Sequence, residues 1–262
     1  MSAVDFLPFL DRLADASGAA ILPFFRTAMG ADDKSAGGAF DPVTEADRGA
    51  EVALRRMIEA QFPAHGIIGE EFGSVRTDSE YVWVLDPIDG TKSFISGLPT
   101  WGTLIGLMHH GNPCYGLMHQ PFTGEKFSGD NEASYFRARG AKDAGRRLRV
   151  RACDDLSTAT LMTTSPRLFK THERTAFERV EERVRLSRYG GDCYAYCMLA
   201  AGHVDLVIEA GLQPYDIVAL IPIIRGAGGI ITTWDGTDPA GGGAIIAAGD
   251  GRIHAAAMEL LK

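Results

Sequence analysis

The segment with the richest chemistry in the sequence is D-P-I-D-G-T, at residues 86–91. Its two carboxylates, Asp86 and Asp89, stand three residues apart directly after a short β-prone run, and a proline between them restrains the chain. The side chain of Ile88 has no polar atom, so this residue can offer only its backbone carbonyl. Carboxylate and carbonyl oxygens are the ligands that Mg²⁺ prefers. The segment therefore predicts a site for a hard divalent cation.

The next residues add a phosphate-binding element. Gly90 and Thr91 have free backbone N–H groups, and such groups bind anions when they begin a helix. A plainer interpretation is also open, in which Asp86 caps a helix and Asp89 and Gly90 form an ordinary turn. Acidic residues elsewhere in the chain favour the first interpretation.

Three further acidic positions extend the predicted cation site. Glu70 follows a short apolar run, Asp47 lies in the first turn of an expected helix, and Asp216 precedes the apolar run 217–224. Considered singly, Glu70 could be an ordinary surface residue. Asp47 and Asp216 could each lie at the start of a helix, where a negative charge is favourable. Taken together they form an acidic set drawn from both halves of the chain, which is what a two-metal site between two halves requires.

This set resembles the inositol-monophosphatase-like family of Mg²⁺-dependent phosphatases. The resemblance covers nearly the whole chain. It rests on V-T-x-A-D at 43–47, G-E-E at 69–71, W-V-L-D-P-I-D-G-T-x-x-F at 83–94, and Asp216 ahead of A-G-G at 227–229.

The resemblance implies a homodimeric phosphatase that uses two or three Mg²⁺ ions and acts on a small-molecule phosphate monoester. It implies metal ligands that offer carboxylate or carbonyl oxygens: Glu70, Asp86, Ile88, Asp89 and Asp216. It also implies that Asp47 and Thr91 form the catalytic pair that orients the attacking water. Gly90 and Thr91 are the expected phosphate-binding residues.

The spacing excludes two other kinds of phosphate chemistry. Haloacid-dehalogenase phosphatases use D-x-D-x-T, in which the two aspartates are two positions apart, whereas Asp86 and Asp89 are three positions apart. A Walker A loop has a glycine directly before Lys-Ser, and Thr91 stands at that position here.

Substrate selection is expected in the second half of the chain. The predicted substrate-binding residues are Arg188, Gly191, Asp192, Cys193 and Glu209. Inositol monophosphatases carry a small neutral triplet, G-T/S-A, where this chain has Gly191-Asp192-Cys193. An acid at that position suits a cationic leaving group better than a neutral polyol.

Y-G-x-D at 189–192 and L-x-P-Y-D-x-x-A-L-x-P-I at 212–223 resemble the histidinol-phosphate phosphatase branch of the family. Histidinol carries an amine and an imidazole, for which Asp192 and Glu209 are suitable partners. We therefore expect hydrolysis of histidinol phosphate to histidinol and phosphate, a step of histidine biosynthesis. As alternatives, Asp192 caps its helix, and Arg188 is a surface residue or pairs with that aspartate.

Two other functions stay open. The first is an inositol-1-monophosphatase or a broader small-molecule phosphate monoesterase. The second, more remote, is a non-catalytic metal-binding regulatory protein, which would be expected to have lost Asp47 or Thr91.

The elements that must position these residues follow from periodicity. Helices are expected over residues 3–28, which Pro23 kinks or ends, and over 44–62, with Thr44 as N-cap. β-Prone runs separated by turns fill the middle of the chain, and strands then alternate with helices. The expected strands are 81–85, 101–108, 114–118, 125–128, 134–137, 160–164, 184–187, 204–208, 229–232 and 244–248, and the later helices 172–182, 192–201, 215–226 and 252–261.

This order predicts a layered α/β sandwich of two subdomains, residues 1–146 and 147–262, which together make one catalytic unit. The family resemblance implies more narrowly an α-β-α-β-α sandwich of the inositol monophosphatase / fructose-1,6-bisphosphatase type.

Composition limits the partners. The 262 residues include 26 Lys+Arg and 34 Asp+Glu, a formal net charge of −8, which disfavours binding to nucleic acid or an anionic membrane. No apolar run reaches the ~18 residues of a membrane span. The first nine residues contain no Lys or Arg, which is not typical of a signal peptide. The four cysteines form no C-x-x-C pair and are expected to be reduced. A cytoplasmic location is therefore expected.

Overall fold

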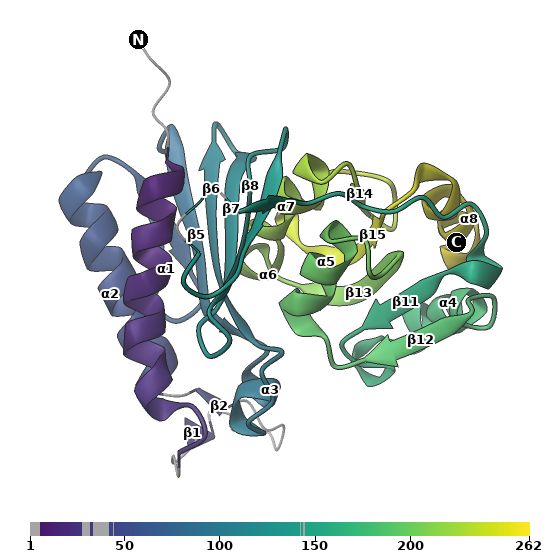
Figure 1. Cartoon of the computed structure of the whole chain (residues 1–262), viewed down its shortest axis with the longest axis horizontal. Coiled ribbons are helices and arrows are strands. Elements are labelled where there is room, and N and C mark those ends of the chain that lie inside the picture. The colour runs from purple at the N-terminus through teal and green to yellow at the C-terminus, as the bar shows by residue number, and fades with distance from the viewer. Residues whose placement is uncertain (1–5, 28–31, 34–41, 44, 142, 144) are drawn as a thin grey trace.

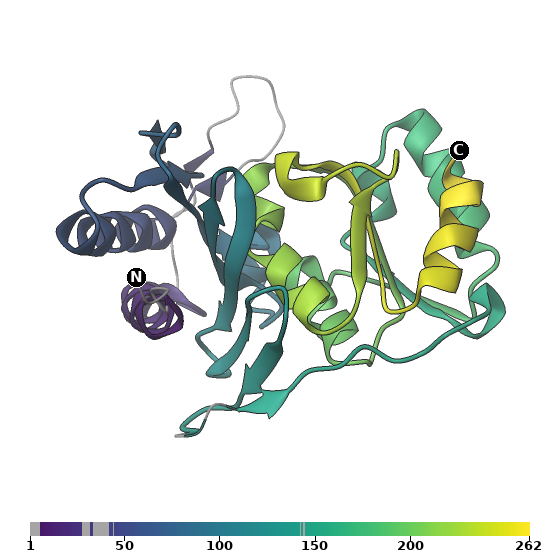
Figure 2. The same ribbon diagram turned by 90° about the horizontal axis from the view of Figure 1, so that it is seen from above.

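The computed structural model describes residues 6–27, 32–33, 42–43, 45–141, 143 and 145–262. Its helices and sheets form five layers, α-β-α-β-α (Figure 1). Seen from above, helices cover the outer face of each sheet and a further group of helices fills the space between the two sheets (Figure 2). The predicted layered α/β sandwich is therefore confirmed.

The helices belong to three layers. The outer layer on the N-terminal side contains α1 (Leu7–Ile21) and α2 (Glu45–Gln61), the middle layer α5 (Asp192–Ala200), α6 (Pro214–Ile217) and α7 (Leu220–Gly226), and the other outer layer α4 (Thr171–Glu181) and α8 (Gly251–Leu261). A short helix, α3 (Thr91–Ile95), directly follows the longest parallel-paired strand of the first sheet, β5 (Tyr81–Asp89). Single turns of 3₁₀ helix are η1 (Leu22–Phe24), η2 (Leu156–Thr158), η3 (Pro166–Leu168) and η4 (Pro239–Gly241).

The first sheet has eight strands within the described residues, in the spatial order β10-β9-β8-β7-β6-β5-β3-β4. Along the chain they are β3 (Gly66–Gly69), β4 (Gly73–Val75), β5 (Tyr81–Asp89), β6 (Gly102–His109), β7 (Asn112–Gln120), β8 (Glu125–Gly129), β9 (Ser134–Arg137) and β10 (Arg146–Arg147). β3 and β5 run parallel, and every other pair in this sheet is antiparallel. This parallel pair brings the ends of β3 and β5 to the same edge of the sheet.

The second sheet has five strands in the described part of the chain, in the order β12-β11-β13-β15-β14. They are β11 (Thr160–Thr163), β12 (Leu186–Tyr189), β13 (Leu206–Leu212), β14 (Ile230–Thr233) and β15 (Gly243–Ala248). β11 pairs in parallel with β12 and β13, whereas β15 is antiparallel to β13 and β14. Two short strands, β1 (Asp32–Asp33) and β2 (Pro42–Val43), pair with each other apart from both sheets.

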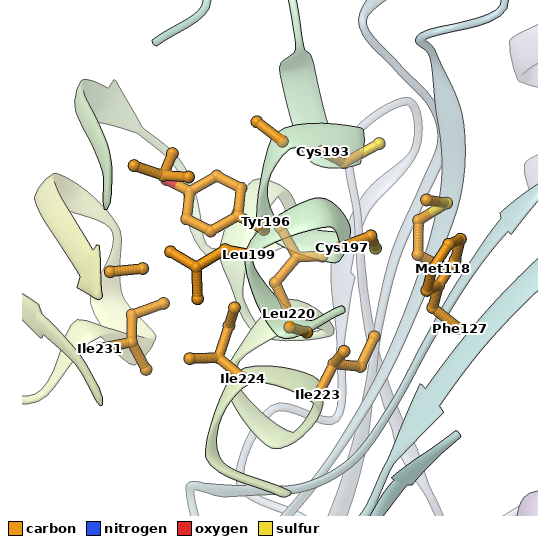
Figure 3. Packing of buried hydrophobic residues seen from close by; sticks show 14 of the residues in the cluster. Met118, Phe127, Cys193, Tyr196, Cys197, Leu199, Leu220, Ile223, Ile224 and Ile231 are labelled. Carbon is orange, nitrogen blue, oxygen red and sulfur yellow. The ribbon is translucent and has the colours of Figure 1, made fainter. Parts of the chain in front are cut away.

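The middle layer joins the two sheets through apolar contacts. Met118 and Phe127 of the first sheet face Cys197 of α5 and Ile223 of α7, while Ile231 approaches from the second sheet (Figure 3). Each large side chain buried this way contributes about 1.5–3 kcal/mol to the free energy of unfolding. This packing holds the two halves in the fixed relation that a site between them needs.

Several expected elements change at prolines. The helix expected over 3–28 ends as α1 at Ile21, because Pro23 supplies no N–H and the chain tightens into η1. The helix expected over 215–226 is divided into α6 and α7. Pro222 cannot donate to the carbonyl four residues earlier, and its ring crowds that turn, so the regular helix is interrupted at 218–219.

Other boundaries also differ. The strand expected over 81–85 continues to Asp89, and the strand expected over 184–187 lies at Leu186–Tyr189 as β12. The expected helix start at Thr44 lies outside the described residues. The boundary expected between residues 146 and 147 falls inside β10, so that division of the chain stays a prediction. None of the helices within the described residues has the length and apolarity needed to cross a membrane.

Candidate active site

A cavity of about 310 Å³ opens where β5 ends, between the first sheet and the middle layer of helices. Polar and acidic groups make up most of its wall. The lining residues are Glu70, Asp86, Ile88, Asp89, Gly90, Thr91, Lys92, Thr164, Asp192 and Asp216. The structure thus gathers residues that lie up to 146 positions apart in the sequence.

The end of β5 is shaped by a bulge. Asp86 pairs with Leu104 and Asp89 with Gly102, so three steps along β5 match two along β6. An extra residue of this kind bends a strand and re-aims its side chains. The Thr103 hydroxyl fixes the bend by donating to the Pro87 carbonyl at 2.8 Å.

Gly90 then leaves the strand with φ at +83°, a left-handed conformation that suits glycine, and serves as N-cap of α3. A Cβ at this position would lie 2.9 Å from the Asp192 carboxylate, so glycine also makes room for that side chain. Thr91 is the first residue of α3, and its hydroxyl donates to the Ile88 carbonyl at 3.3 Å. These contacts bring the Ile88 carbonyl, Thr91 and the two β5 aspartates to one side of the chain.

The predicted acids form two overlapping clusters. One ligand atom from each of Asp47, Glu70 and Asp86 lies within 4.8 Å of the others, and the same holds for Asp86, Asp89 and Asp216. Asp86 is shared by the two clusters. This arrangement is what two neighbouring cations with a common ligand would need.

Burial dominates the electrostatics of these acids. It raises the pKa of Asp86 well above the ordinary value, and the carboxylates of Glu70 and Asp89 raise it further. The pKa of Asp89 is raised in the same way, by burial and then by Asp192 and Asp216. Burial also raises the pKa of Asp216 to about 6. Burial and mutual repulsion therefore make these acids harder to ionise when no cation is close to them.

The donor set fits a metal centre. Oδ1 of Asp86 is buried and makes no hydrogen bond to any residue of the described chain, and a buried oxygen without a partner is costly. Every predicted ligand offers oxygen, the donor that hard divalent cations prefer over nitrogen or sulfur. Cations at these clusters would supply the missing partner and neutralise the mutual repulsion of the carboxylates.

Asp216 reaches the cluster from the opposite half of the chain. It is the third residue of α6, where its Oδ2 accepts a hydrogen bond from the Gln213 N–H at 2.6 Å. This is a capping box, in which the side chain satisfies a free N–H at the helix start. Asp216 is thus held by its own helix while it lines the cavity.

Asp192 occupies an unusual backbone position at the start of α5. Its φ is +44°, and its Oδ2 accepts a hydrogen bond from the Ser93 hydroxyl at 2.6 Å. The alternative role as N-cap is wrong, because the N-cap residue is Gly191. The helix start is capped from the other half of the molecule instead, where Asp89 Oδ2 accepts from the Cys193 N–H at 2.7 Å. Burial raises the pKa of Asp192.

Four predicted substrate residues do not line the cavity. Arg188 is exposed on the edge strand β12, whereas Gly191 and Cys193 are buried at the start of α5. Glu209 is buried within β13 beneath Thr164, with Oε1 accepting the Thr164 N–H. The strand expected over 204–208 lies at Leu206–Leu212 and contains an irregularity after Glu209.

Glu209 therefore supports a residue that lines the cavity. Its Oε2 accepts from the Thr163 hydroxyl at 3.2 Å, and burial raises its pKa to about 7. Asp47, the proposed partner of Thr91, is buried in the first turn of α2 and belongs to the acidic cluster rather than to the cavity lining.

An ion pair that was not predicted from the sequence supports Glu70. Glu51 is fully buried on α2 and accepts hydrogen bonds from Arg55 Nε at 2.6 Å, the Glu71 N–H at 2.7 Å and the Phe72 N–H at 3.2 Å. These bonds hold the loop that carries Glu70. The i, i+4 spacing of Asp47, Glu51 and Arg55, which puts all three on the apolar face of α2, was the available signal.

Ser93, Lys92 and Thr164 were also missed. Lys92 and Ser93 directly follow the predicted residue Thr91 in the sequence, whereas Thr164 comes to the cavity, and Asp192 to Ser93, only through the fold.

Comparison with known sequences agrees with this geometry. A sequence profile of the inositol monophosphatase family matches residues 5–262. The chain belongs to the inositol monophosphatase family. Members are metal-dependent phosphatases of small phosphate monoesters, which is the chemistry that the acidic clusters and the cavity support.

Relatives within the family differ in what their names state. The bifunctional phosphatase IMPL2 of Arabidopsis thaliana is 46% identical over 96% of this chain and 73% of its own length. A histidinol-phosphatase of Streptomyces coelicolor is 34% identical over 96% of this chain and 94% of its own. The solved structure of an inositol monophosphatase from Zymomonas mobilis has a TM-score of 0.87 at 38% identity and covers 99% of both chains. This likeness confirms the predicted fold type.

Proposed function

We propose that this member of the inositol monophosphatase family is a Mg²⁺-dependent phosphatase that hydrolyses histidinol phosphate. The observation that carries the proposal is the Asp192 carboxylate, which lines the cavity beside Gly90 and Thr91. A carboxylate there can hold the cationic amine or imidazole of histidinol, while Mg²⁺ held by the acid clusters would neutralise the phosphate. The names of several relatives, among them the Streptomyces enzyme, support the same substrate.

The proposed metal ligands are Glu70, Asp86, the Ile88 carbonyl, Asp89 and Asp216, with two or three Mg²⁺ ions between them. Bound Mg²⁺ would neutralise charge on the transferring phosphoryl group and make water a stronger nucleophile. The protein's own contribution is to keep these oxygens in place, through the β5 bulge and the capping box of α6.

Asp47 and Thr91 are the proposed catalytic pair. The Thr91 hydroxyl donates its hydrogen to the Ile88 carbonyl, which leaves its oxygen free to accept a hydrogen bond from a water molecule. Asp47 is buried and can take a proton as that water attacks phosphorus. The backbone N–H groups of Gly90 and Thr91, at the start of α3, are the proposed phosphate donors.

Ser93 is the proposed positioning residue for Asp192. Its hydroxyl donates to Asp192 Oδ2 and itself accepts from the Thr100 hydroxyl at 3.0 Å. This chain of hydrogen bonds fixes the carboxylate before any substrate arrives, which reduces the entropy lost on binding.

The test is phosphate release from histidinol phosphate and from inositol-1-phosphate, with and without Mg²⁺. We expect kcat/KM to be at least tenfold higher for histidinol phosphate and turnover to vanish on chelation of the metal. Preference for inositol-1-phosphate would replace the substrate proposal by the second candidate, which the Zymomonas likeness favours. Absence of Mg²⁺-dependent hydrolysis of either ester would leave the non-catalytic alternative.

A homodimer and a cytoplasmic location complete the proposal. The homodimer is what the family resemblance implies, and the location is what the sequence pattern leads us to expect. Light scattering of the purified protein tests the first, and cell fractionation tests the second.

A further inference from the structure

Three nitrogen and oxygen donors meet at the end of the first sheet opposite the active site. Glu80 directly precedes β5, His109 ends β6, and His110 follows in the turn to β7. One ligand atom from each lies within 4.8 Å of the others. Because β5 is antiparallel to β6, with Tyr81 opposite His109, this cluster sits at the far end of the strands from α3 (Figure 1).

The turn that carries His110 is tied to Glu80. His110 and Gly111 have φ of +48° and +78° between the paired residues His109 and Asn112, as in a two-residue turn with both central residues left-handed. The His110 N–H donates to the Glu80 carbonyl at 2.8 Å, and Asn112 Nδ2 donates to the His110 carbonyl at 3.1 Å. The backbone of the cluster is thus fixed by hydrogen bonds.

The His109 ring is held by aromatic stacking. It lies 4.5 Å from the Tyr81 ring at an angle of 21°, and Tyr81 lies 5.0 Å from His65 at 24°. His65 is in turn held by Trp83, whose Nε1 donates to His65 Nδ1 at 3.1 Å. This column of rings leaves His109 Nε2 directed at Glu80 Oε1, 3.1 Å away.

We propose that Glu80, His109 and His110 form a binding site for a divalent transition-metal ion such as Zn²⁺ or Ni²⁺. Two imidazoles and a carboxylate suit these ions, whereas Mg²⁺ prefers the all-oxygen clusters of the active site. At Zn–N distances of about 2.0–2.1 Å, the ligands of a tetrahedral ion are about 3.3 Å apart. The pair His109 and Glu80 already has this spacing.

His110 completes the site by a modest movement. It is exposed, so rotation about its side-chain bonds can bring its ring nitrogen to the ion, and water fills the remaining position. At about 3.3 Å per residue along β5, Glu80 lies about 20 Å from Asp86, which is the nearer active-site acid of that strand. Its effect is therefore structural, since the ion links the β6–β7 turn to the start of β5.

The test uses the whole chain without an affinity tag, in saturating Mg²⁺. Zn²⁺ and, separately, Ni²⁺ are titrated by calorimetry, and Tm is recorded with and without each ion. We expect the wild type to bind one more ion per chain than His110→Asn, with a rise in Tm that the variant lacks. The wild type and the variant both retain the active-site acids, so any ion bound there contributes equally to the two titrations and does not affect the difference between them.

The variants are chosen to keep the fold. Asparagine is favoured at left-handed turn positions, so His110→Asn removes the imidazole and retains the turn. Glu80→Gln removes the carboxylate and should weaken binding at least tenfold. The matched control is His172→Asn, which removes an exposed imidazole on α4 and should bind as the wild type does. Equal stoichiometry, affinity and Tm change in wild type and His110→Asn would overturn the proposal.

Discussion

Replacing Asp192 with asparagine separates the charge of this side chain from its shape. Asparagine tolerates the left-handed φ of +44°, and its carbonyl oxygen can still accept the hydrogen bond from Ser93. Alanine would add backbone strain and lose that bond, so its effect on turnover would have several causes. The asparagine variant changes one thing, the negative charge offered to the leaving group.

The size of the effect follows from the hydrogen bond that is weakened. A bond between a carboxylate and a cationic amine contributes about 1.5–3 kcal/mol, compared with about 0.5–1.5 kcal/mol for a neutral pair. The difference of about 1–1.5 kcal/mol corresponds to a fall of about 5- to 13-fold, at about 1.36 kcal/mol per tenfold. We expect kcat/KM for histidinol phosphate to fall by about this factor and that for inositol-1-phosphate to change less than threefold, because a neutral hydroxyl gains little from the charge.

The assay is phosphate release from both esters at saturating Mg²⁺, with Asp250→Asn as the control. Asp250 caps α8, where its Oδ1 accepts from the Arg252 N–H at 2.9 Å, so the same chemical change is made at another helix start. The control should leave both activities unchanged. Equal losses on the two substrates in Asp192→Asn would refute the reasoning, because they would show that the charge serves the site as a whole.

Three further outcomes are expected. Asp89→Asn should reduce phosphate release at least a thousandfold even at high Mg²⁺, because a metal ligand is lost. The circular dichroism spectrum should be retained, because the amide oxygen can still accept the hydrogen bond at the start of α5. Substantial activity would contradict this prediction. Thr91→Val should lower kcat far more than it raises KM, because the hydroxyl acts on the water in the transition state; a change in KM alone would make Thr91 a binding residue. Burial lowers the pKa of His119 to about 4. Between about pH 6.5 and pH 4 this imidazole is therefore protonated in the unfolded chain and neutral in the folded chain. The free energy of unfolding should fall by about 2 kcal/mol between pH 7 and pH 5 for this reason. Urea unfolding of wild type and His119→Gln should show this part of the pH dependence in the wild type alone, and identical profiles would disprove it.

The sequence could predict the acidic set because the D-P-I-D-G-T segment keeps its ligands close together. It could also predict where the strand and helices lie that bring Asp86, Asp89 and Asp47 to the site. Asp216 was identifiable through the family resemblance, although spacing alone could not show that it meets Asp86 between the first sheet and the middle layer. The local sequence pattern thus identified the acidic residues, whereas only the structure shows that the two halves of the chain bring them together.

The supporting groups could not be read from local pattern in the same way. The buried charge of Glu51 is possible only because Arg55 and two backbone N–H groups surround it, and those groups come from a separate loop. Glu209 is a polar residue inside a strand, and nothing in its neighbours shows that it bonds to Thr164 rather than to a ligand. The interruption of the helix at 218–219 was foreseeable from Pro222, since the effect of proline on the preceding turn is local.

The hydrogen bond from the Cys193 N–H to Asp89 Oδ2 has a consequence for hydrogen exchange. The amide begins a helix of the middle layer, whereas its acceptor belongs to the first sheet. For this N–H to exchange with solvent, the first turn of α5 must open and a carboxylate of the metal cluster must be released in the same event. The exchange rate of this single amide therefore reports how firmly the two halves of the molecule are joined at the active site, and its amide resonance offers a direct signal of cation binding that needs no substrate.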